Sequence, residues 1–420
     1  MKHVPPDLKS AILRGRCIAF VGAGFAMPVV PTWGALLQRI GEGLDSPVTL
    51  PAQPTAFQFE AIGQGLQDEA RKRAPDEWKK RVRAALDEAA AASDQRPGLA
   101  ARSKWLRSIP FKAILTTNFD SSLSGAATNL ETYWNVLRNE VSPGWQLQDG
   151  LDTEFGEPPI IKLHGDVDQA GAELVFSRAD YRQLIYGDGN YANFVRAVFA
   201  GYTLLFLGVS FTDAYLNELR SEVLNLLHRQ GREGVPWGYA IQINTSPQLV
   251  EFFEKHESIR TLPAKDPAEF DEWLESIARA TSVEGRLSTL LEGKTIVWVD
   301  ASRENNVRGR ALFERCGATV HHLLSENALD DSHAKADLLI TQFGHDAGGR
   351  HRALGVLDKV SGWRDRPPVI VFAAAGSPDE VRANRSVCLR HGAFEYATQW
   401  NELYAFIESL LDRTPGRSNS

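Results

Sequence analysis

The chain has 420 residues, which is too long for one ordinary hydrophobic core, so we expect two or three domains. Apolar residues make up 43% and charged residues 24%, as in a globular protein, and the net charge of −7 provides no general attraction to nucleic acid or to an anionic membrane. Three cysteines without a CxxC pair exclude a four-cysteine zinc site.

We expect a cytoplasmic protein that binds no metal. Residues 1–10 lack the apolar core of a signal peptide, and no run approaches about 18 apolar residues. The ten histidines show no HExxH spacing. Lysine and arginine gather at residues 71–83, but acidic residues lie beside and among them, so we expect a solvated helix face and no direct nucleic-acid binding.

The first two thirds of the chain alternate apolar runs with helical patterns. Residues 17–21 form a continuously apolar run, which is typical of a strand covered on both faces, and a Gly-Ala-Gly turn and a helix at residues 33–44 follow it. Residues 55–108 predict a helical insertion. Further strands are predicted at 111–115, 159–163, 174–176, 203–207 and 239–243, with a short extended piece at 259–262. This alternation predicts a Rossmann-like, doubly wound parallel α/β sheet.

The alternation restarts near residue 290. Strands are predicted at 294–299, 318–323, 337–341, 368–372 and 394–396, with helices at 305–316, 350–360, 378–391 and 400–412. Five βα units in this length predict a flavodoxin-like α/β domain. We therefore divide the chain into residues 1–290, residues 291–414 and a tail at 415–420 that is expected to be disordered.

Polar or glycine-rich motifs follow several of these strands. Gly22 and Gly24 allow a close approach of backbone N–H groups to a pyrophosphate, or serve a tight turn for steric reasons. Asn118 and Asp120, directly after a strand, suit the amide and hydroxyls of a nucleoside, or an Asx-turn and a helix cap.

Two further strand ends carry similar signals. His164 suits a general base with a pKa near neutrality, or a structural histidine. Gly208, Ser210 and Asp213 suit a second phosphate or ribose contact, or a helix cap. Because such motifs follow four separate strands, we predict a site that holds a dinucleotide and performs chemistry on it.

In this order the motifs resemble the sirtuin superfamily, specifically the sirtuin-like domains of bacterial defence proteins. The resemblance covers residues 10–280. The matching segments are Phe20-Val21-Gly22-Ala23-Gly24, Pro31-Thr32-Trp33-Gly34, Thr116-Thr117-Asn118-Phe119-Asp120, Ile161-Lys162-Leu163-His164-Gly165 and Phe206-Leu207-Gly208-Val209-Ser210-Phe211-Thr212-Asp213.

The resemblance implies that NAD binds across the sheet edge as the substrate. It implies catalytic roles for Asn118, which positions the attacking water, and His164, which accepts a proton. The positions that it implies for NAD binding are Gly22, Ala23, Gly24, Thr117, Asp120, Gly208, Ser210 and Asn244.

Two departures from the family pattern bear on the reaction. Ala26 stands where a serine is usual, and the four-cysteine zinc module of the family's deacetylases is missing. Because that module helps to form the acyl-lysine groove, its absence favours simple NAD cleavage to nicotinamide and ADP-ribose.

We therefore expect an NAD+ hydrolase that acts as an effector in antiphage defence. Its activity would be regulated by homo-oligomerisation or by a defence partner such as an ATPase or an Argonaute-like protein. The alternatives are a non-catalytic NAD or ADP-ribose sensor, an ADP-ribosyltransferase and an NAD-dependent protein deacylase.

The C-terminal domain resembles a receiver domain of two-component signalling, but its acidic cluster is incomplete. Asp300 is the one clear carboxylate at the first strand end, Gln342 stands at the phospho-acceptor position, and the last strand offers no lysine. We expect Mg²⁺ binding and phosphorylation to be lost. The domain then reads as a degenerate receiver for partner binding, oligomerisation or sensing, and a small-ligand pocket stays open as an alternative.

Overall fold

A computed structural model describes residues 2–52, 54–123, 126–127, 158–169, 173–187, 189–211, 214–229, 236–344 and 351–411. The chain forms two compact units that divide between Thr281 and Ser282. Helix α12 (Val283–Leu291), which precedes the boundary expected near residue 290, buries Val283, Leu287 and Leu291 in the core of the second unit. The tail at 415–420 lies outside the described residues.

The first unit is built on a sheet of parallel strands in the order β3-β4-β2-β1-β5-β6-β7. The strands are β1 (Cys17–Val21), β2 (Ile114–Thr116), β3 (Ala126–Ala127), β4 (Ile160–Lys162), β5 (Thr203–Leu207), β6 (Gly238–Ile243) and β7 (Ile259–Ala264). The order reverses between β1 and β5, so the predicted Rossmann-like, doubly wound sheet is confirmed. The strand predicted at 174–176 is wrong, because these buried residues are irregular, and β3 was not predicted.

Strand β1 shows why the sheet carries helices on both faces. Each of its residues is buried, with Cys17, Ala19 and Val21 in one core and Ile18 and Phe20 in the other. Alternate residues of a strand point to opposite faces, so an unbroken apolar run needs two covering layers. The first core takes α1 (Pro6–Leu13), α5 (Arg96–Ser108) and α11 (Pro267–Thr281); the second takes α8 (Gly189–Gly201), α9 (Ala214–Arg229) and α10 (Pro247–His256).

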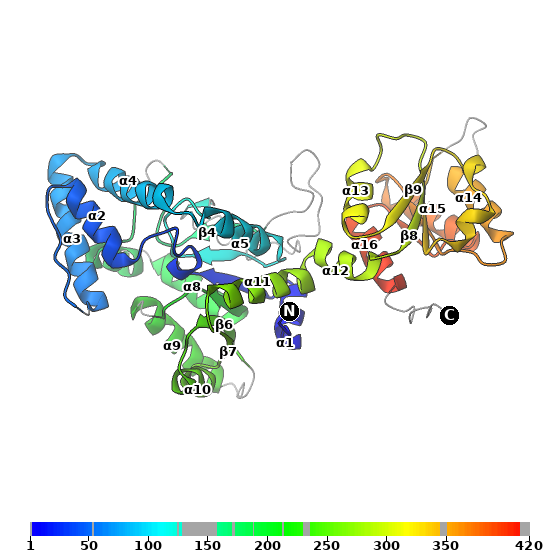
Figure 1. The fold of residues 1–420 in the computed structure, drawn as a ribbon. Helices are drawn as coiled ribbons and strands as arrows, with labels where there is room; N and C mark the ends of the chain where they lie inside the picture. The colour runs from blue at the N-terminus through cyan, green and yellow to red at the C-terminus, as the bar shows by residue number, and fades with distance from the viewer. Residues whose placement is uncertain are drawn as a thin grey trace. The chain divides into compact units, whose positions relative to one another are not determined.

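The predicted helical insertion at 55–108 divides between two cores. Helices α3 (Ala56–Arg73) and α4 (Glu77–Ala92) pack with α2 (Trp33–Gly43) in a separate core that also holds residues of the loops after β2 and β4, while α5 covers the sheet. Figure 1 shows α2, α3 and α4 together at one end of this unit, in blue to cyan. Thr55 and Gln58 form a capping box that starts α3. Short segments α7 (Arg178–Arg182) and η2 (Gln183–Gly187) precede α8.

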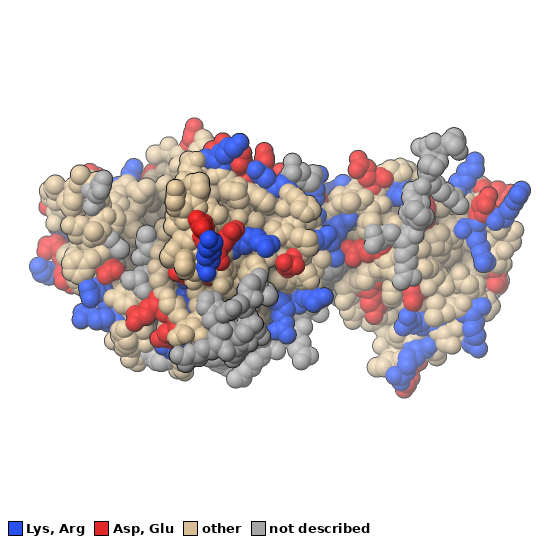
Figure 2. All heavy atoms as spheres, turned by 90° about the horizontal axis from the view of Figure 1, so that it is seen from below, with Lys and Arg blue, Asp and Glu red and all other residues tan. Residues whose placement is uncertain are grey.

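The basic residues at 71–83 lie on α3 and α4 and are matched by acidic neighbours. The ion pairs are Arg71–Glu173, Lys72–Glu69, Arg73–Asp45, Lys80–Asp76, Arg81–Glu77 and Arg83–Asp168. Figure 2 likewise shows basic and acidic side chains interspersed on the face in view. No helix in the described part of the chain is long and apolar enough to cross a membrane.

The second unit contains a parallel sheet in the order β12-β11-β10-β8-β9. Its strands are β8 (Thr295–Val299), β9 (Thr319–Leu323), β10 (Leu338–Gln342), β11 (Val369–Phe372) and β12 (Glu395–Ala397). Its helices beyond α12 are α13 (Val307–Arg315), α14 (Arg352–Ser361), α15 (Pro378–Arg390) and α16 (Trp400–Leu411), with 3₁₀ turns η3 (Glu326–Ala328) and η4 (Asp331–Lys335). This strand order confirms the predicted flavodoxin-like fold.

Gly309 in α13 supplies a test of the packing in the second unit. A Cβ at this position would overlap the indole ring of Trp400, which packs on the core. Alanine ordinarily favours a helix over glycine by about 1 kcal/mol, but overpacking costs about 1–3 kcal/mol. We expect Gly309→Ala to lower the free energy of unfolding by about 1–2 kcal/mol, measured by calorimetry of the full chain.

The matched control for Gly309→Ala is Gly355→Ala in α14. Its Cβ would lie 3.5 Å from the flexible side chain of Glu326, which is ordinary contact. This variant should be neutral or more stable by up to about 1 kcal/mol. Equal effects of the two substitutions would contradict the packing of Gly309 against Trp400.

Candidate functional site

The candidate site is organised by four neighbouring strands of the first sheet that end level with one another. Val21 of β1 is the register partner of Thr116 on β2 and of Leu207 on β5, and Thr116 is the partner of Lys162 on β4. The loops that leave β4, β2, β1 and β5 therefore start side by side at the carboxyl edge. The four motifs predicted to act on a dinucleotide begin in this row, and the reversal of strand order lies inside it.

The turn after β1 packs directly on the end of β5. The N–H of Gly22 donates to the carbonyl of Leu207 at 2.9 Å, and the N–H of Gly24 donates to that of Gly208 at 3.0 Å. A Cβ at Gly22 or Gly24 would approach the Gly208 carbonyl oxygen to 2.7 or 2.8 Å. Contact between two backbones therefore explains why both positions are glycine.

Gly208 and Ala26 complete this contact. Gly208 has a φ of +63°, and a Cβ there would overlap the backbone at Phe25. Ala26, at the position where the resemblance led us to expect serine, is completely buried. A methyl group suits that position, because a buried hydroxyl would require a hydrogen-bond partner.

Arg102 of α5 holds the same turn from within the protein. Its guanidinium donates to the carbonyls of Phe25 and Met27 and pairs with Asp271 of α11, with Nε to Oδ1 at 2.6 Å. Only 7% of Arg102 is exposed, and the guanidinium lies over the Phe25 and Phe270 rings. This planar group thus ties the turn to two helices that cover the sheet.

The loop after β2 turns Asn118 toward β1. Thr116 donates through Oγ1 to the carbonyl of Val21 at 2.9 Å and accepts the backbone N–H of Asn118 at 3.0 Å. The Asn118 side chain, which is 5% exposed, donates through Nδ2 to the carbonyl of Gly22 at 3.2 Å. This bond sets the orientation of the amide group, with Nδ2 directed to Gly22 and Oδ1 on the other side of the amide group. Neighbouring Thr117 is half-buried and bonds through its N–H to the Val21 carbonyl.

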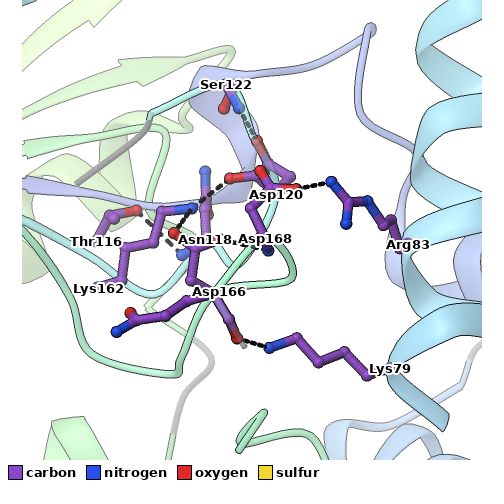
Figure 3. A network of polar contacts seen from close by, with 10 residues as sticks. Lys79, Arg83, Thr116, Asn118, Asp120, Ser122, Lys162, Asp166 and Asp168 are labelled. Atoms are coloured by element: carbon purple, nitrogen blue, oxygen red, sulfur yellow. Dashed lines mark hydrogen bonds and ion pairs between the residues drawn. The ribbon is translucent and has the colours of Figure 1, made fainter. Parts of the chain in front are cut away.

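Asp120 is held within its own loop and by Lys162. Its Oδ1 accepts the backbone N–H of Ser122 at 2.8 Å, which is the Asx-turn that the sequence left open. Its carbonyl accepts Nζ of Lys162 at 2.6 Å, and the same Nζ pairs with Asp166 at 3.0 Å (Figure 3). Lys162 is completely buried, and Asp120 and Asp166 are each 5% exposed.

Helix α4 reaches the loop that follows His164. Arg83 pairs with Asp168, and Lys79 donates to the carbonyl of Gln169. Figure 3 shows both side chains extending from α4 toward this loop. Asp166 accepts the backbone N–H of Asp168 at 2.8 Å through Oδ1. The loop is therefore tied to the sheet through Lys162 and to the helical insertion through α4.

His164 lies beside two stacked tyrosines. It is 4% exposed, and its ring meets the edge of Tyr181 at a centroid distance of 5.1 Å. Tyr181 stacks on Tyr215 of α9 at 4.8 Å. Burial, followed by the nearby charge of Glu60, raises the pKa of Tyr215. After His164 the chain turns sharply at Gly165, which has a φ of +86°.

The other predicted binding positions lie along the same edge of the sheet, and several are exposed to solvent. Ala23 and Gly24 are exposed at the turn after β1, and Ser210 is exposed beyond β5. Asn244, at a φ of +53°, follows β6 and bonds to the carbonyl of Ala264. Asp213 lies outside the described residues.

Several residues of this site were missed by sequence reasoning. Lys162 had a signal, since a charge inside an apolar strand requires a buried partner. Arg102, Tyr181 and Tyr215 lie on helices with ordinary spacing, and nothing local marks them. Among the described residues, no three His, Cys, Asp or Glu side chains are placed to hold a metal.

The second unit carries its own strand-end cluster around Asp300. This carboxylate is completely buried and accepts the side-chain N–H groups of Asn305 at 3.1 Å and Asn306 at 2.9 Å, together with the backbone N–H of Ser302. Gln342, where the resemblance led us to expect the phospho-acceptor, ends β10. Neutral amides thus satisfy both oxygens of Asp300.

Comparison with known proteins finds similarity in part of the first unit. Residues 112–262 match the model of the SIR2-like domain, a segment that holds Asn118, His164, Gly208 and Asn244. The chain is also 28% identical over 130 residues to the NAD(+) hydrolase ThsA of Enterococcus faecium. This alignment covers 30% of the chain and 25% of ThsA, so the chain spans about a quarter of that relative's length.

Solved receiver domains are also similar to the chain. One is the receiver domain of a Francisella response regulator, with 16% identity and a TM-score of 0.23, covering 29% of this chain and 98% of that structure. Another is the receiver domain of a histidine kinase from Syntrophus aciditrophicus, with 18% identity and a TM-score of 0.23, covering 30% of this chain and 97% of that structure.

Gly208 provides a test of the contact between β1 and β5. Alanine at a positive φ costs about 1–2 kcal/mol, and overlap with the Phe25 backbone adds about 1–3 kcal/mol. We expect Gly208→Ala to lower the free energy of unfolding of the first unit by about 2–5 kcal/mol, measured by chemical denaturation.

The control is Gly65→Ala in α3, where a Cβ would meet nothing within 4 Å. This variant should be neutral or slightly stabilising, because alanine favours the helix. A Gly208→Ala protein as stable as the Gly65→Ala protein would show that the turn after β1 does not pack on β5.

Proposed function

We propose that the first unit is an NAD+ hydrolase that releases nicotinamide and ADP-ribose. One observation carries the proposal: the level ends of β4, β2, β1 and β5 set the loops of His164 and Asn118 in one row that includes the reversal of strand order between β1 and β5. Doubly wound sheets bind nucleotides in the crevice outside the strand ends at such a reversal. The SIR2-like match and the name of the relative support NAD as the substrate.

The turn after β1 is proposed to receive the pyrophosphate through few groups. The N–H groups of Gly22, Gly24, Phe25 and Ala26 already donate to protein carbonyls. The N–H of Ala23 has no such bond to another described residue, and Ala23 is exposed at the edge. Thr117, after β2, and Gly208 and Ser210, after β5, are the proposed lining toward the ribose and phosphate groups.

The proposed reaction divides the chemistry between Asn118 and His164. Because Asn118 Nδ2 donates to the Gly22 carbonyl, the orientation of the amide is set, and Oδ1 is proposed to accept a hydrogen bond from a water molecule beside the nicotinamide ribose. As the C–N bond to nicotinamide breaks, the water oxygen bonds to the ribose carbon and its proton passes to His164. The products are nicotinamide, ADP-ribose and one proton, which balances the reaction.

The second unit is proposed to regulate this activity. A free NAD hydrolase would deplete the cofactor of its own cell, so an effector of antiphage defence requires restraint by self-association or by a partner. The resemblance to defence proteins supports this role, together with an ATPase or an Argonaute-like protein as the class of partner. Light scattering after size exclusion, with and without NAD, tests self-association. A monomer in both conditions would exclude regulation by self-association and leave regulation by a partner protein.

Two substitutions test the proposed catalytic pair. We expect Asn118→Ala and His164→Ala each to lower nicotinamide release by about 10²–10⁴-fold, because each removes the group that orients or deprotonates the water. Free nicotinamide is measured by chromatography after incubation with NAD. Asn193→Ala and His256→Ala, which change exposed residues of α8 and α10, should retain the wild-type rate.

The same assay separates the alternatives. A sensor would bind NAD in calorimetry without releasing nicotinamide, and a deacylase would release it only when an acylated peptide is added. Wild-type turnover by folded Asn118→Ala and His164→Ala proteins would contradict the proposed mechanism.

A further inference from the structure

We infer that Lys162 is a positioning residue that sets Asn118 and His164 relative to each other. Its ammonium group joins the loop that carries one of them to the loop that carries the other. This inference rests on the proposed function, because it assigns these two residues to one reaction. Lys162 itself is completely buried and is not proposed to contact NAD.

The ammonium of Lys162 has one partner in each loop. Nζ donates to the carbonyl of Asp120 at 2.6 Å and pairs with Oδ2 of Asp166 at 3.0 Å. Figure 3 shows the Lys162 side chain reaching the loop of Asn118 from the neighbouring strand. Asp120 follows Asn118 by two residues, and Asp166 follows His164 by two residues, so both anchors lie next to the proposed catalytic side chains.

Backbone contacts accompany this link. The N–H of Leu163 donates to the carbonyl of Thr116 at 2.8 Å, and the N–H of Val167 donates to that of Phe119 at 3.0 Å. These backbone bonds align the loop after β2 with the loop after β4. Lys162 adds a charged contact between the same loops, and the strength of that contact depends on its direction and distance. Charge-assisted hydrogen bonds of this kind are shorter and stronger than neutral ones.

The charge of Lys162 requires an explanation, because its neighbours along the strand are apolar. Ile160, Ile161 and Leu163 beside Lys162 are buried in the sheet. Burying an ammonium and a carboxylate costs several kcal/mol each, and apolar pairs of the same volume are often as stable. A lysine in this strand is therefore a poor choice for stability alone, and its two contacts indicate a geometric role.

The link continues from Asp166 to the helical insertion. Asp166 accepts the N–H of Asp168 at 2.8 Å, and Asp168 pairs with Arg83 of α4. Lys79 of α4 adds a hydrogen bond to the Gln169 carbonyl. Release of Lys162 would therefore loosen the loop of His164 at its inner end while α4 still held the outer end.

The decisive experiment compares the variant Lys162→Met with the double variant Lys162→Met/Asp166→Asn. The single variant leaves a buried carboxylate unpaired and should be destabilised. The double variant removes both charges and keeps an amide oxygen that can accept the N–H of Asp168, so it should recover most of the lost Tm. If Lys162 positions the site, both variants show a kcat for nicotinamide release about 100-fold below wild type, with KM for NAD within about threefold.

The matched control is Lys112→Met. Lys112 is also buried, at 8% exposure, but it precedes β2 at the amino-terminal end of the sheet, away from the strand ends that form the site. The same substitution there should leave kcat unchanged. Recovery of kcat together with Tm in Lys162→Met/Asp166→Asn would overturn the inference, because Lys162 would then serve stability alone.

A spectroscopic measurement separates this inference from the proposed function. In protein labelled at histidine, the imidazole signals of His164, assigned with His164→Ala, should shift in Lys162→Met/Asp166→Asn and remain in place in Lys112→Met. Unchanged His164 signals would overturn the positioning role whatever the activity. Wild-type protein that releases no nicotinamide would instead contradict the proposed hydrolase, and the His164 shift would still report on Lys162.

Discussion

The site depends on the register of four parallel strands. Val21, Thr116, Lys162 and Leu207 lie level across β4, β2, β1 and β5, so the loops that follow them begin in one row. A slip of one residue would turn every side chain of a strand to the opposite face. The two apolar cores on either side of β1 prevent such a slip, because each strand residue has a place in one core or the other.

Most polar groups at the candidate site are engaged with the protein itself. Gly22 and Gly24 meet the backbone of Gly208, Asp120 closes an Asx-turn, and Asp166 pairs with Lys162. These contacts fix the loops at the carboxyl edge of the sheet. Asn118 takes part through its amide nitrogen, which donates to the carbonyl of Gly22.

The second unit also has a parallel sheet, but a different set of polar residues lies at its strand ends. Asp300 occupies the end of β8, and Asn305 and Asn306 satisfy its two oxygens. The sheet order is that of the flavodoxin-like fold, and Gln342, where the resemblance to receivers led us to expect a phospho-acceptor, ends β10.

The sequence by itself determined both sheets and the motifs at their strand ends, because buried strands, helix spacing and glycine turns are local patterns. It misplaced a strand at 174–176 and missed β3, since these short segments depend on neighbours far along the chain. Only the tertiary structure showed that Lys162 meets the Asp120 carbonyl 42 residues away and that Arg102 holds the turn after β1. The partners of a buried charge are set by folding, which brings distant segments together, and no local pattern encodes them.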